Sequence, residues 1–393
     1  MTATTTERLH SLDFVRGSAL LLGIVFHAGL SFYPSEIPTW IVMDAQRSEP
    51  IAWLGFVLHT FRMATFFLLA GYFGRMVYHR KGAGYFIRSR LKRIAAPLAI
   101  FLPLNLVAIT VLLIWAMMRQ YGLTMEQMPP SPPPTLETFP WTHLWFLYVL
   151  ILAYIAMLVL RLPIAMLDRG GKVRAGVDGL LNTLTTSSLS PLLLALPVAI
   201  ALYNQPGWNE WMGVPTPDTG VVPNTPAMVT YGLAFWLGWQ LQRGTNALLP
   251  FKRFWPLFLV SGAGAIGICL YLVDGQPGAM PTLEGREKMI FAASYALAIW
   301  YLTFAFIGMA IAFFNGENRV TRYIADSSYW LYIIHLPIVL AMQIWIFDWN
   351  WSAEAKYAFI LGTSVPAMLL SYHLLVRYSF IGNLLNGPRK RKA

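Results

Sequence analysis

The chain has 393 residues, of which 56% are hydrophobic and only 12% are charged, and its formal net charge is +11. Soluble domains carry about twice that charged fraction, so the composition excludes an ordinary soluble protein. The positive charge does not indicate a nucleic-acid partner, because the basic residues cluster between long apolar runs, where they report membrane topology.

Apolar runs near or above the ~20 residues needed to cross a bilayer recur along the chain. They predict an all-α, polytopic integral membrane protein with about ten transmembrane helices, at residues 12–33, 51–74, 95–118, 142–161, 188–204, 226–242, 254–273, 289–314, 327–347 and 355–378. The fifth and sixth ranges are short and contain proline or glycine. Residues 1–393 are therefore interpreted as a single transmembrane domain with a basic tail at 379–393.

Lys and Arg are divided unequally between alternate connections. One set, counted with Arg8 and the C-terminal tail, holds 22 of them, whereas the other set holds only Arg47, Arg119, Arg286, Lys288 and Lys356. An excess of Lys and Arg marks cytoplasmic loops. Both the N- and C-termini are therefore predicted to be cytoplasmic, in agreement with an even number of spans.

The first predicted helix carries two basic side chains, Arg16 and His27, among its apolar residues. They lie eleven residues apart, which is roughly 16 Å along a helix. An ionisable side chain inside a membrane span is costly and indicates a functional site. His59 and Arg62 share one face of the second helix, in its outer half, so a cluster of His27, His59 and Arg62 is sterically possible. The structural alternative is that these side chains only satisfy one another inside the bundle.

Histidine suits acyl or proton transfer, because its ordinary pKa lies near working pH. It either deprotonates an acceptor hydroxyl or carries the acyl group itself. Arginine binds carboxylate or phosphate through a planar, permanently charged fork. A proton-coupled anion transporter uses the same residue types, so that alternative stays open. No metal site is expected, because no His-x-Glu or Cys-x-x-Cys pattern occurs.

Four blocks occur in order along the chain: LDFVRGSALLLGIVFH (12–27), FFLLAGYF (66–73), HLWFL (143–147) and SSYWLYIIHLP (327–337). Together they resemble the membrane-bound acyltransferase 3 family over nearly the whole length. Arg16 and His27 match the family's Arg-x10-His signature. The second block matches FF-x-x-SG except at Ala70, where serine is usual.

The resemblance implies an acyl-CoA donor on the cytoplasmic side and a carbohydrate hydroxyl on the exported side, with no permanently bound cofactor. It implies that His27 is the key catalytic residue and that Arg16 supports it. Substrate contacts are expected from Arg62, His59, His143, Trp145 and His335. The basic stretch 75–93 suits the phosphate-rich coenzyme A, and its best candidates for donor binding are Arg88, Arg90 and Arg93.

Residues 22–28, 59–63 and 377–387 are most similar to a branch of the family that succinylates osmoregulated periplasmic glucans. This implies a multi-pass protein of the bacterial inner membrane, with a glucan acceptor and glucan-synthesis proteins as partners. Arg62 would then contact the succinyl carboxylate. The structural alternative for Arg62 is an ion pair that holds helices together, with Asp13, Glu36 or Asp44. An acetyltransferase for another surface polysaccharide is the alternative within the family. Trp208 and Trp211, in the exported loop 205–225, are interpreted as interfacial or sugar-stacking residues.

Overall fold

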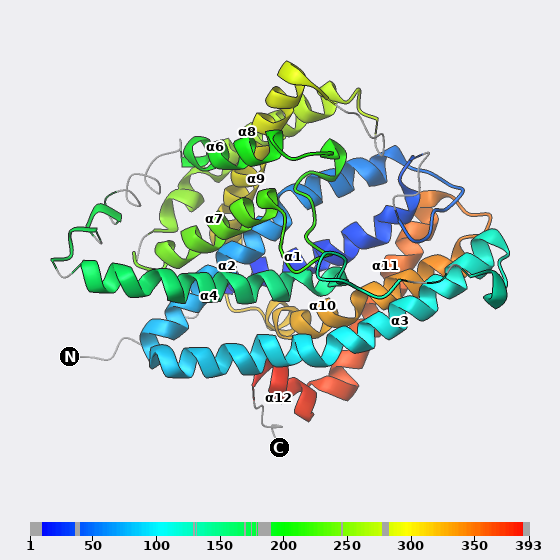
Figure 1. Ribbon diagram of the computed structural model, residues 1–393, viewed down its shortest axis with the longest axis horizontal. Coiled ribbons are helices and arrows are strands. Elements are labelled where there is room, and N and C mark those ends of the chain that lie inside the picture. Colours follow the sequence, from blue (N-terminus) through cyan, green and yellow to red (C-terminus); the bar gives the residue numbers. More distant parts are fainter. Residues whose placement is uncertain are drawn as a thin grey trace.

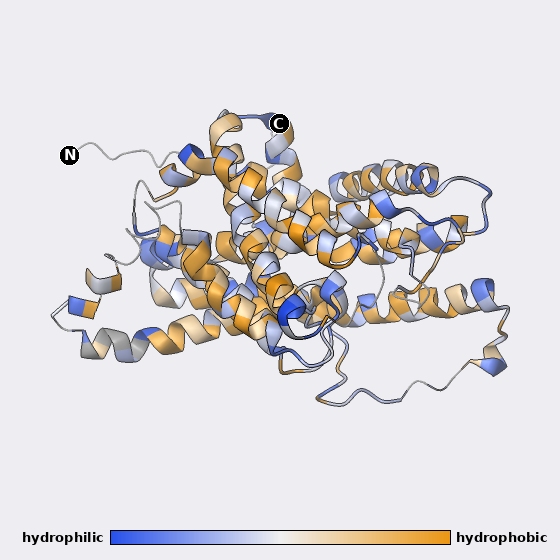
Figure 2. Cartoon of the chain, turned by 90° about the horizontal axis from the view of Figure 1, so that it is seen from above, coloured by the Kyte–Doolittle hydropathy of each residue, from blue (hydrophilic) through white to orange (hydrophobic). Residues whose placement is uncertain are grey.

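The computed structural model describes residues 10–35, 40–128, 130, 132–168, 170–173, 175–177, 179, 190–244, 247–276 and 283–387. Within these residues it is helical, without β-strands beyond an isolated bridge between Pro140 and Thr219. Figure 1 shows the long helices packed into one bundle. Apolar residues dominate them, whereas hydrophilic residues gather at helix ends and connections (Figure 2). Arg8, Glu36, Arg169, Arg174 and residues 388–393 of the basic tail lie outside the described residues.

In the part of the chain that the structure describes, all ten predicted ranges fall on helices, apart from a few residues at their ends. The longer helices are α1 His10–Gly29, α2 Glu49–Arg90, α3 Ala96–Tyr121, α4 Trp145–Leu167, α6 Ser190–Tyr203, α7 Thr225–Leu241, α8 Leu249–Leu272, α9 Gly285–Phe313, α10 Arg319–Ile346, α11 Ala353–Ser371 and α12 Phe380–Asn386. Single turns named here are η1 Leu30–Phe32, η2 Leu91–Ala95, η4 Thr142–Leu144, η5 Glu210–Met212 and η6 Tyr372–Val376.

By length and apolarity, seven helical runs of the described residues can cross a membrane. One of them, Glu49–Tyr121, contains two predicted helices. The backbone leaves helical geometry at Gly82, with φ 79° and ψ 168°. The chain turns there, and the second predicted helix follows as α3 (Figure 1). The 14-residue α6 is too short for a full crossing. The chain is thus a multi-pass membrane protein, and the count of ten crossings stays a prediction.

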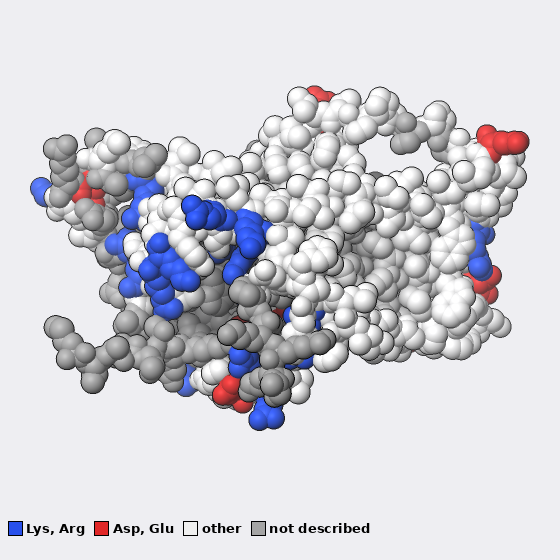
Figure 3. Space-filling model, turned by 90° about the horizontal axis from the view of Figure 1, so that it is seen from below, with Lys and Arg blue, Asp and Glu red and all other residues white. Residues whose placement is uncertain are grey.

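Basic segments meet at one end of the bundle, called here the basic end. There the start of α10 accepts hydrogen bonds from Arg16 of α1 and from Asn386 of α12, both at 2.9 Å. Tyr329 of α10 donates to the Arg93 carbonyl at 2.7 Å. Both described termini therefore lie at this end. Figure 3 shows Lys and Arg gathered toward one side, and a smaller group beside acidic residues at the opposite side.

The opposite end, called here the far end, brings together the α1–α2 connection, the end of α3 and the α10–α11 connection. Arg119 of α3 forms an ion pair there with Asp348. Lys356 of α11 forms another with Asp44, at 2.8 Å. Ion pairs thus hold two of the basic residues at the far end. The assignment of the basic end to the cytoplasm stays a prediction.

Glycines let α2 and α7 approach closely. A Cβ added at Gly71 would lie 2.0 Å from the Phe235 carbonyl oxygen, and one added at Gly238 would lie 1.8 Å from that of Leu68. No side chain fits in these spaces. Gly71 belongs to the FF-x-x-SG block, so part of that block is explained by helix packing of the small-residue type common in membranes.

Candidate functional site

Helices α1 and α10 pack along each other and carry polar contacts over their shared length. Near the basic end, Arg16 Nη2 donates to the Ala325 carbonyl at 2.9 Å and lies 3.5 Å from the Asp13 carboxylate. Eleven residues further along α1, His27 meets His335 of α10. The two residues of the Arg-x10-His signature therefore face the same partner helix, at separate depths.

The two imidazoles have a defined hydrogen-bond pattern. His335 Nδ1 lies 2.8 Å from the Tyr332 carbonyl oxygen, which only accepts, so this nitrogen carries the proton. In the neutral ring His335 Nε2 then accepts. It lies 3.1 Å from His27 Nδ1, which is also 2.9 Å from the Gly23 carbonyl oxygen. His27 Nδ1 is therefore the donor, and the pattern leaves His27 Nε2 unprotonated and able to act as a base.

His143 extends this arrangement from the turn η4, at the start of α4. Its ring stands edge-on to His335, with 5.0 Å between centroids. Its Nε2 lies 3.1 Å from the Ile333 carbonyl oxygen, and its own carbonyl accepts from the Tyr332 hydroxyl at 2.7 Å. Three imidazoles from α1, α10 and the turn before α4 therefore lie in a row.

His59 and Arg62 of α2 approach the same place through Phe26. The His59 ring stacks on the Phe26 ring, with 4.9 Å between their centroids. The Arg62 guanidinium also lies over the Phe26 ring, 4.8 Å from its centroid. The His27 ring contacts Phe26 edge-on at 5.2 Å. The predicted cluster of His27, His59 and Arg62 is therefore present around one aromatic ring.

Arg62 is 5% exposed, and none of the described carboxylates forms an ion pair with it. Its Nη1 donates only a long bond, 3.4 Å, to the Leu22 carbonyl. Asp13 and Asp44, which the structural alternative offers as partners, pair instead with Arg16 and Lys356. A buried guanidinium in this state favours an anionic ligand.

At the far side of His27, α1 ends and its last carbonyl groups lose their intrahelical partners. Gln343 of α10 donates to two of them, those of His27 and Ala28, at 3.0 and 3.2 Å. Its side-chain oxygen accepts from Trp40 Nε1 at 3.0 Å. The Trp40 ring lies 5.9 Å from that of His27. Gln343 thus holds the α1–α2 connection over the histidine.

The remaining sequence candidates make other contacts. Trp145 is buried and stacks on Tyr231 and Phe67, at 5.4 and 6.3 Å. Arg88 is exposed, whereas Arg90 contacts the Tyr154 hydroxyl at 3.3 Å. Arg93 lies on the π-helical turn η2 at the basic end.

The interpretation of Trp208 and Trp211 is wrong. They are only 4% and 3% exposed, because Trp208 Nε1 donates to the Gly213 carbonyl and the Trp211 ring packs on Phe56 at 4.9 Å. Sequence reasoning also missed Gln343 and Trp40. A glutamine inside an apolar helix was the available signal for Gln343, because an amide in hydrocarbon needs partners.

The sequence profile of one protein family, described as an acyltransferase domain, matches residues 9–375. The chain is also similar to proteins called glucans biosynthesis protein C. It is 24% identical to that of Escherichia coli SMS-3-5 and 23% identical to that of strain K12, in both cases over 97% of this chain and 96% of the relative. The protein of that name from Shigella dysenteriae serotype 1 is 24% identical over the same shares. No solved structure matches the chain.

Proposed function

The chain belongs to the membrane acyltransferase 3 family and is an acyltransferase, and from this premise we propose that it transfers succinyl from succinyl-CoA to a hydroxyl of an exported carbohydrate. The observation that carries the proposal is the His27–His335 contact, which leaves one imidazole nitrogen of His27 free. Its depth between the basic end and the far end suits two substrates that arrive from opposite faces.

In the proposed reaction, His27 Nε2 takes the proton of the acceptor hydroxyl while that oxygen attacks the thioester carbonyl carbon. The new C–O ester bond forms, the C–S bond breaks, and the proton passes to the sulfur, which leaves as the free thiol of coenzyme A. His335 is a positioning residue, because it holds His27 in the tautomer that has Nε2 available, as partners of catalytic histidines do.

The donor is proposed to bind from the basic end. Arg88 is exposed there, Arg90 and Arg93 are half-buried, and coenzyme A is an anion attracted to such a surface. Arg16, with its side chain 39% exposed, lies between this surface and His27 and would support the donor's passage into the bundle. No permanently bound cofactor is needed for this chemistry.

The acyl group is proposed to be succinyl because of Arg62. Succinyl ends in a carboxylate, which acetyl lacks, and the buried guanidinium has no carboxylate partner among the described residues. The names of the relatives support a glucan as the acceptor. The same names support an enzyme of the inner membrane that works beside glucan-synthesis proteins. The excess of Lys and Arg at the basic end supports an orientation in which this end faces the cytoplasm.

Purified protein in detergent tests this function with succinyl-CoA and a β-linked glucose hexasaccharide. Free thiol and succinylated hexasaccharide should appear in equal amounts, and both should depend on His27. An acyltransferase for another polysaccharide would release thiol only with another acceptor. A folded protein that releases no thiol with any acyl-CoA, but moves anions across liposomes, would contradict the proposal and favour a transporter.

A further inference from the structure

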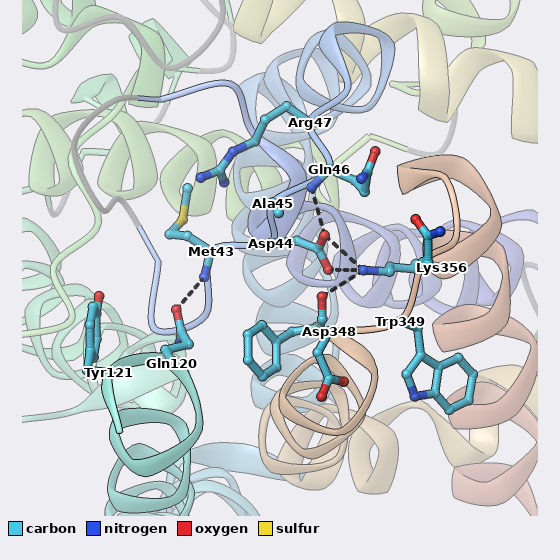
Figure 4. A pocket seen from close by; sticks show the side chains of 12 residues that line it. Met43, Asp44, Ala45, Gln46, Arg47, Gln120, Tyr121, Asp348, Trp349 and Lys356 are labelled. Carbon is cyan, nitrogen blue, oxygen red and sulfur yellow. Dashed lines mark hydrogen bonds and ion pairs between the residues drawn. The ribbon is translucent and has the colours of Figure 1, made fainter. Parts of the chain in front are cut away.

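An open pocket lies at the far end of the bundle. Its walls come from residues 43–47 of the α1–α2 connection, the last residues of α3, residues 347–350 after α10, and Lys356 of α11 (Figure 4). Its cavity volume is about 480 Å³, which lies within the usual range for ligand sites. The contacts described above for catalysis do not use it.

The walls of this pocket are held in place by buried contacts. Lys356 Nζ donates to both carboxylate oxygens of Asp44, at 3.0 and 2.8 Å, and to the Phe347 carbonyl at 2.7 Å. Both charged side chains are at most 3% exposed, and separating such a pair strands a buried charge. Gln120 of α3 accepts from the Met43 backbone at 3.3 Å. The pocket is therefore preformed, which lowers the entropic cost of binding.

Other side chains of the pocket remain open to a ligand. Within the described part of the chain, the amides of Gln46 and Asn350 make no side-chain hydrogen bond, and both residues are exposed. Arg47 Nη1 makes only 3.4 Å bonds to the Ser31 and Tyr33 carbonyls. Trp349 adds a half-buried ring. Its position is fixed by contacts at 5.4, 4.9 and 5.4 Å with the rings of Trp345, Trp351 and Phe359.

These groups match a ligand rich in hydroxyls. An amide both donates and accepts hydrogen bonds, as a hydroxyl does, and an indole offers an apolar face with one polar atom. The ion pairs Asp44–Lys356 and Arg119–Asp348 cancel their charges. The two basic and two acidic residues of the lining balance in charge, so an uncharged carbohydrate fits better than a strongly anionic ligand.

The pocket lies close to His27 along two helices. Asp44 N donates to the Ser31 carbonyl at 3.0 Å, and Ser31 follows His27 by about one helical turn, roughly 6 Å. Gln343, which bonds the His27 carbonyl, precedes Phe347 of the pocket wall by one turn as well. The pocket wall and the imidazole thus lie about one helical turn apart along both helices.

We propose that this far-end pocket binds the sugar units that flank the acylated unit of the acceptor, with Trp349 as a stacking platform and Gln46, Arg47 and Asn350 as hydroxyl partners. The proposal rests on the proposed function for its choice of acceptor, and it adds a binding site for that acceptor, separate from the histidine cluster.

Binding of a β-linked glucose hexasaccharide to the full chain in lipid nanodiscs, measured by calorimetry without any donor, tests the pocket. Trp349→Ala should raise the Kd about tenfold, as expected for the loss of a stacked aromatic contact. Gln46→Ala should also raise the Kd. Because this side chain is exposed, the substitution should leave the fold intact. Trp53→Ala is the matched control, because that tryptophan is also exposed, at the start of α2, but lies outside the pocket.

An unchanged Kd for Trp53→Ala beside weaker binding for the other two variants supports the proposal. Equal effects of Trp349→Ala and Trp53→Ala would assign the tryptophans to the membrane interface and overturn the proposal, as would a wild type that does not bind the hexasaccharide. If His27-dependent thiol release is absent but binding still depends on Trp349 and Gln46, the proposed function fails and the sugar site stands.

Discussion

The α2–α7 contact and the α1–α10 contact hold helices together by different means. Gly71 and Gly238 let α2 and α7 touch backbone to backbone, and the Phe67 and Tyr231 rings stack beside them at 4.9 Å. The α1–α10 contact instead carries Arg16, the His27–His335 pair and Gln343. Since the bundle packs helices well without ionisable groups, cohesion does not account for those of α1 and α10. Their cost in a membrane points to function.

The largest effect is expected from the centre of the polar contact. His27→Ala should lower succinyl transfer by ~10²–10⁴, the usual loss when a general base is removed. His373→Ala is the control, because that imidazole is exposed on η6 near Tyr323. Turnover is measured as succinylated hexasaccharide per folded protein. If His27→Ala and His373→Ala lost turnover equally, or if His27→Ala had normal turnover, His27 would have a structural role only.

The partner of His27 should matter next. His335→Leu removes the acceptor of the His27 Nδ1 proton and should lower kcat by roughly 10–100-fold, as for groups that orient functional histidines. His335→Gln offers a side-chain oxygen near the position of Nε2 and should recover much of that loss. A purely structural His335 would show similar losses in both variants, with parallel losses of folded protein.

Arg62 should affect the choice of donor. Arg62→Met should impair transfer from succinyl-CoA more than from butyryl-CoA, which has the same chain length and no carboxylate. A stranded polar group costs ~1–3 kcal/mol, about 10–100-fold in relative rate. The ratio of kcat/KM values for the two donors reports this. If both rates fall equally, Arg62 holds helices together and does not read the acyl group.

A change in the α2–α7 contact should lower the stability of the protein and should have the smallest effect on turnover. Gly238→Val places a side chain against the Leu68 carbonyl and should cost about 1–3 kcal/mol by overpacking. Gly232→Val, on the same helix, meets no atom within 4 Å of its Cβ and should melt like the wild type. Thermal unfolding in detergent compares them. Equal melting temperatures would show that the close approach of α2 and α7 is dispensable.

Apolar runs were enough to predict where the helices lie, because each run had to be buried or face lipid. Arg16 and His27 stand out in the sequence because they interrupt such an apolar run. The pairing of His27 with His335 was not visible, because 308 residues separate them and no local pattern links them. The division of basic residues places Lys356 in a connection, yet α11 buries it against Asp44. Trp208 and Trp211 pack inward. The sequence could not predict this, because the tertiary contacts of a loop leave no periodic pattern.

Acyl transfer between opposite membrane faces is tested most directly in proteoliposomes that enclose the hexasaccharide, with succinyl-CoA added outside. Molecules with the basic end outward should release free thiol outside and form an equal amount of succinylated hexasaccharide inside, and His27→Ala should do neither. Product formed only when both substrates share one compartment would contradict transfer across the bundle.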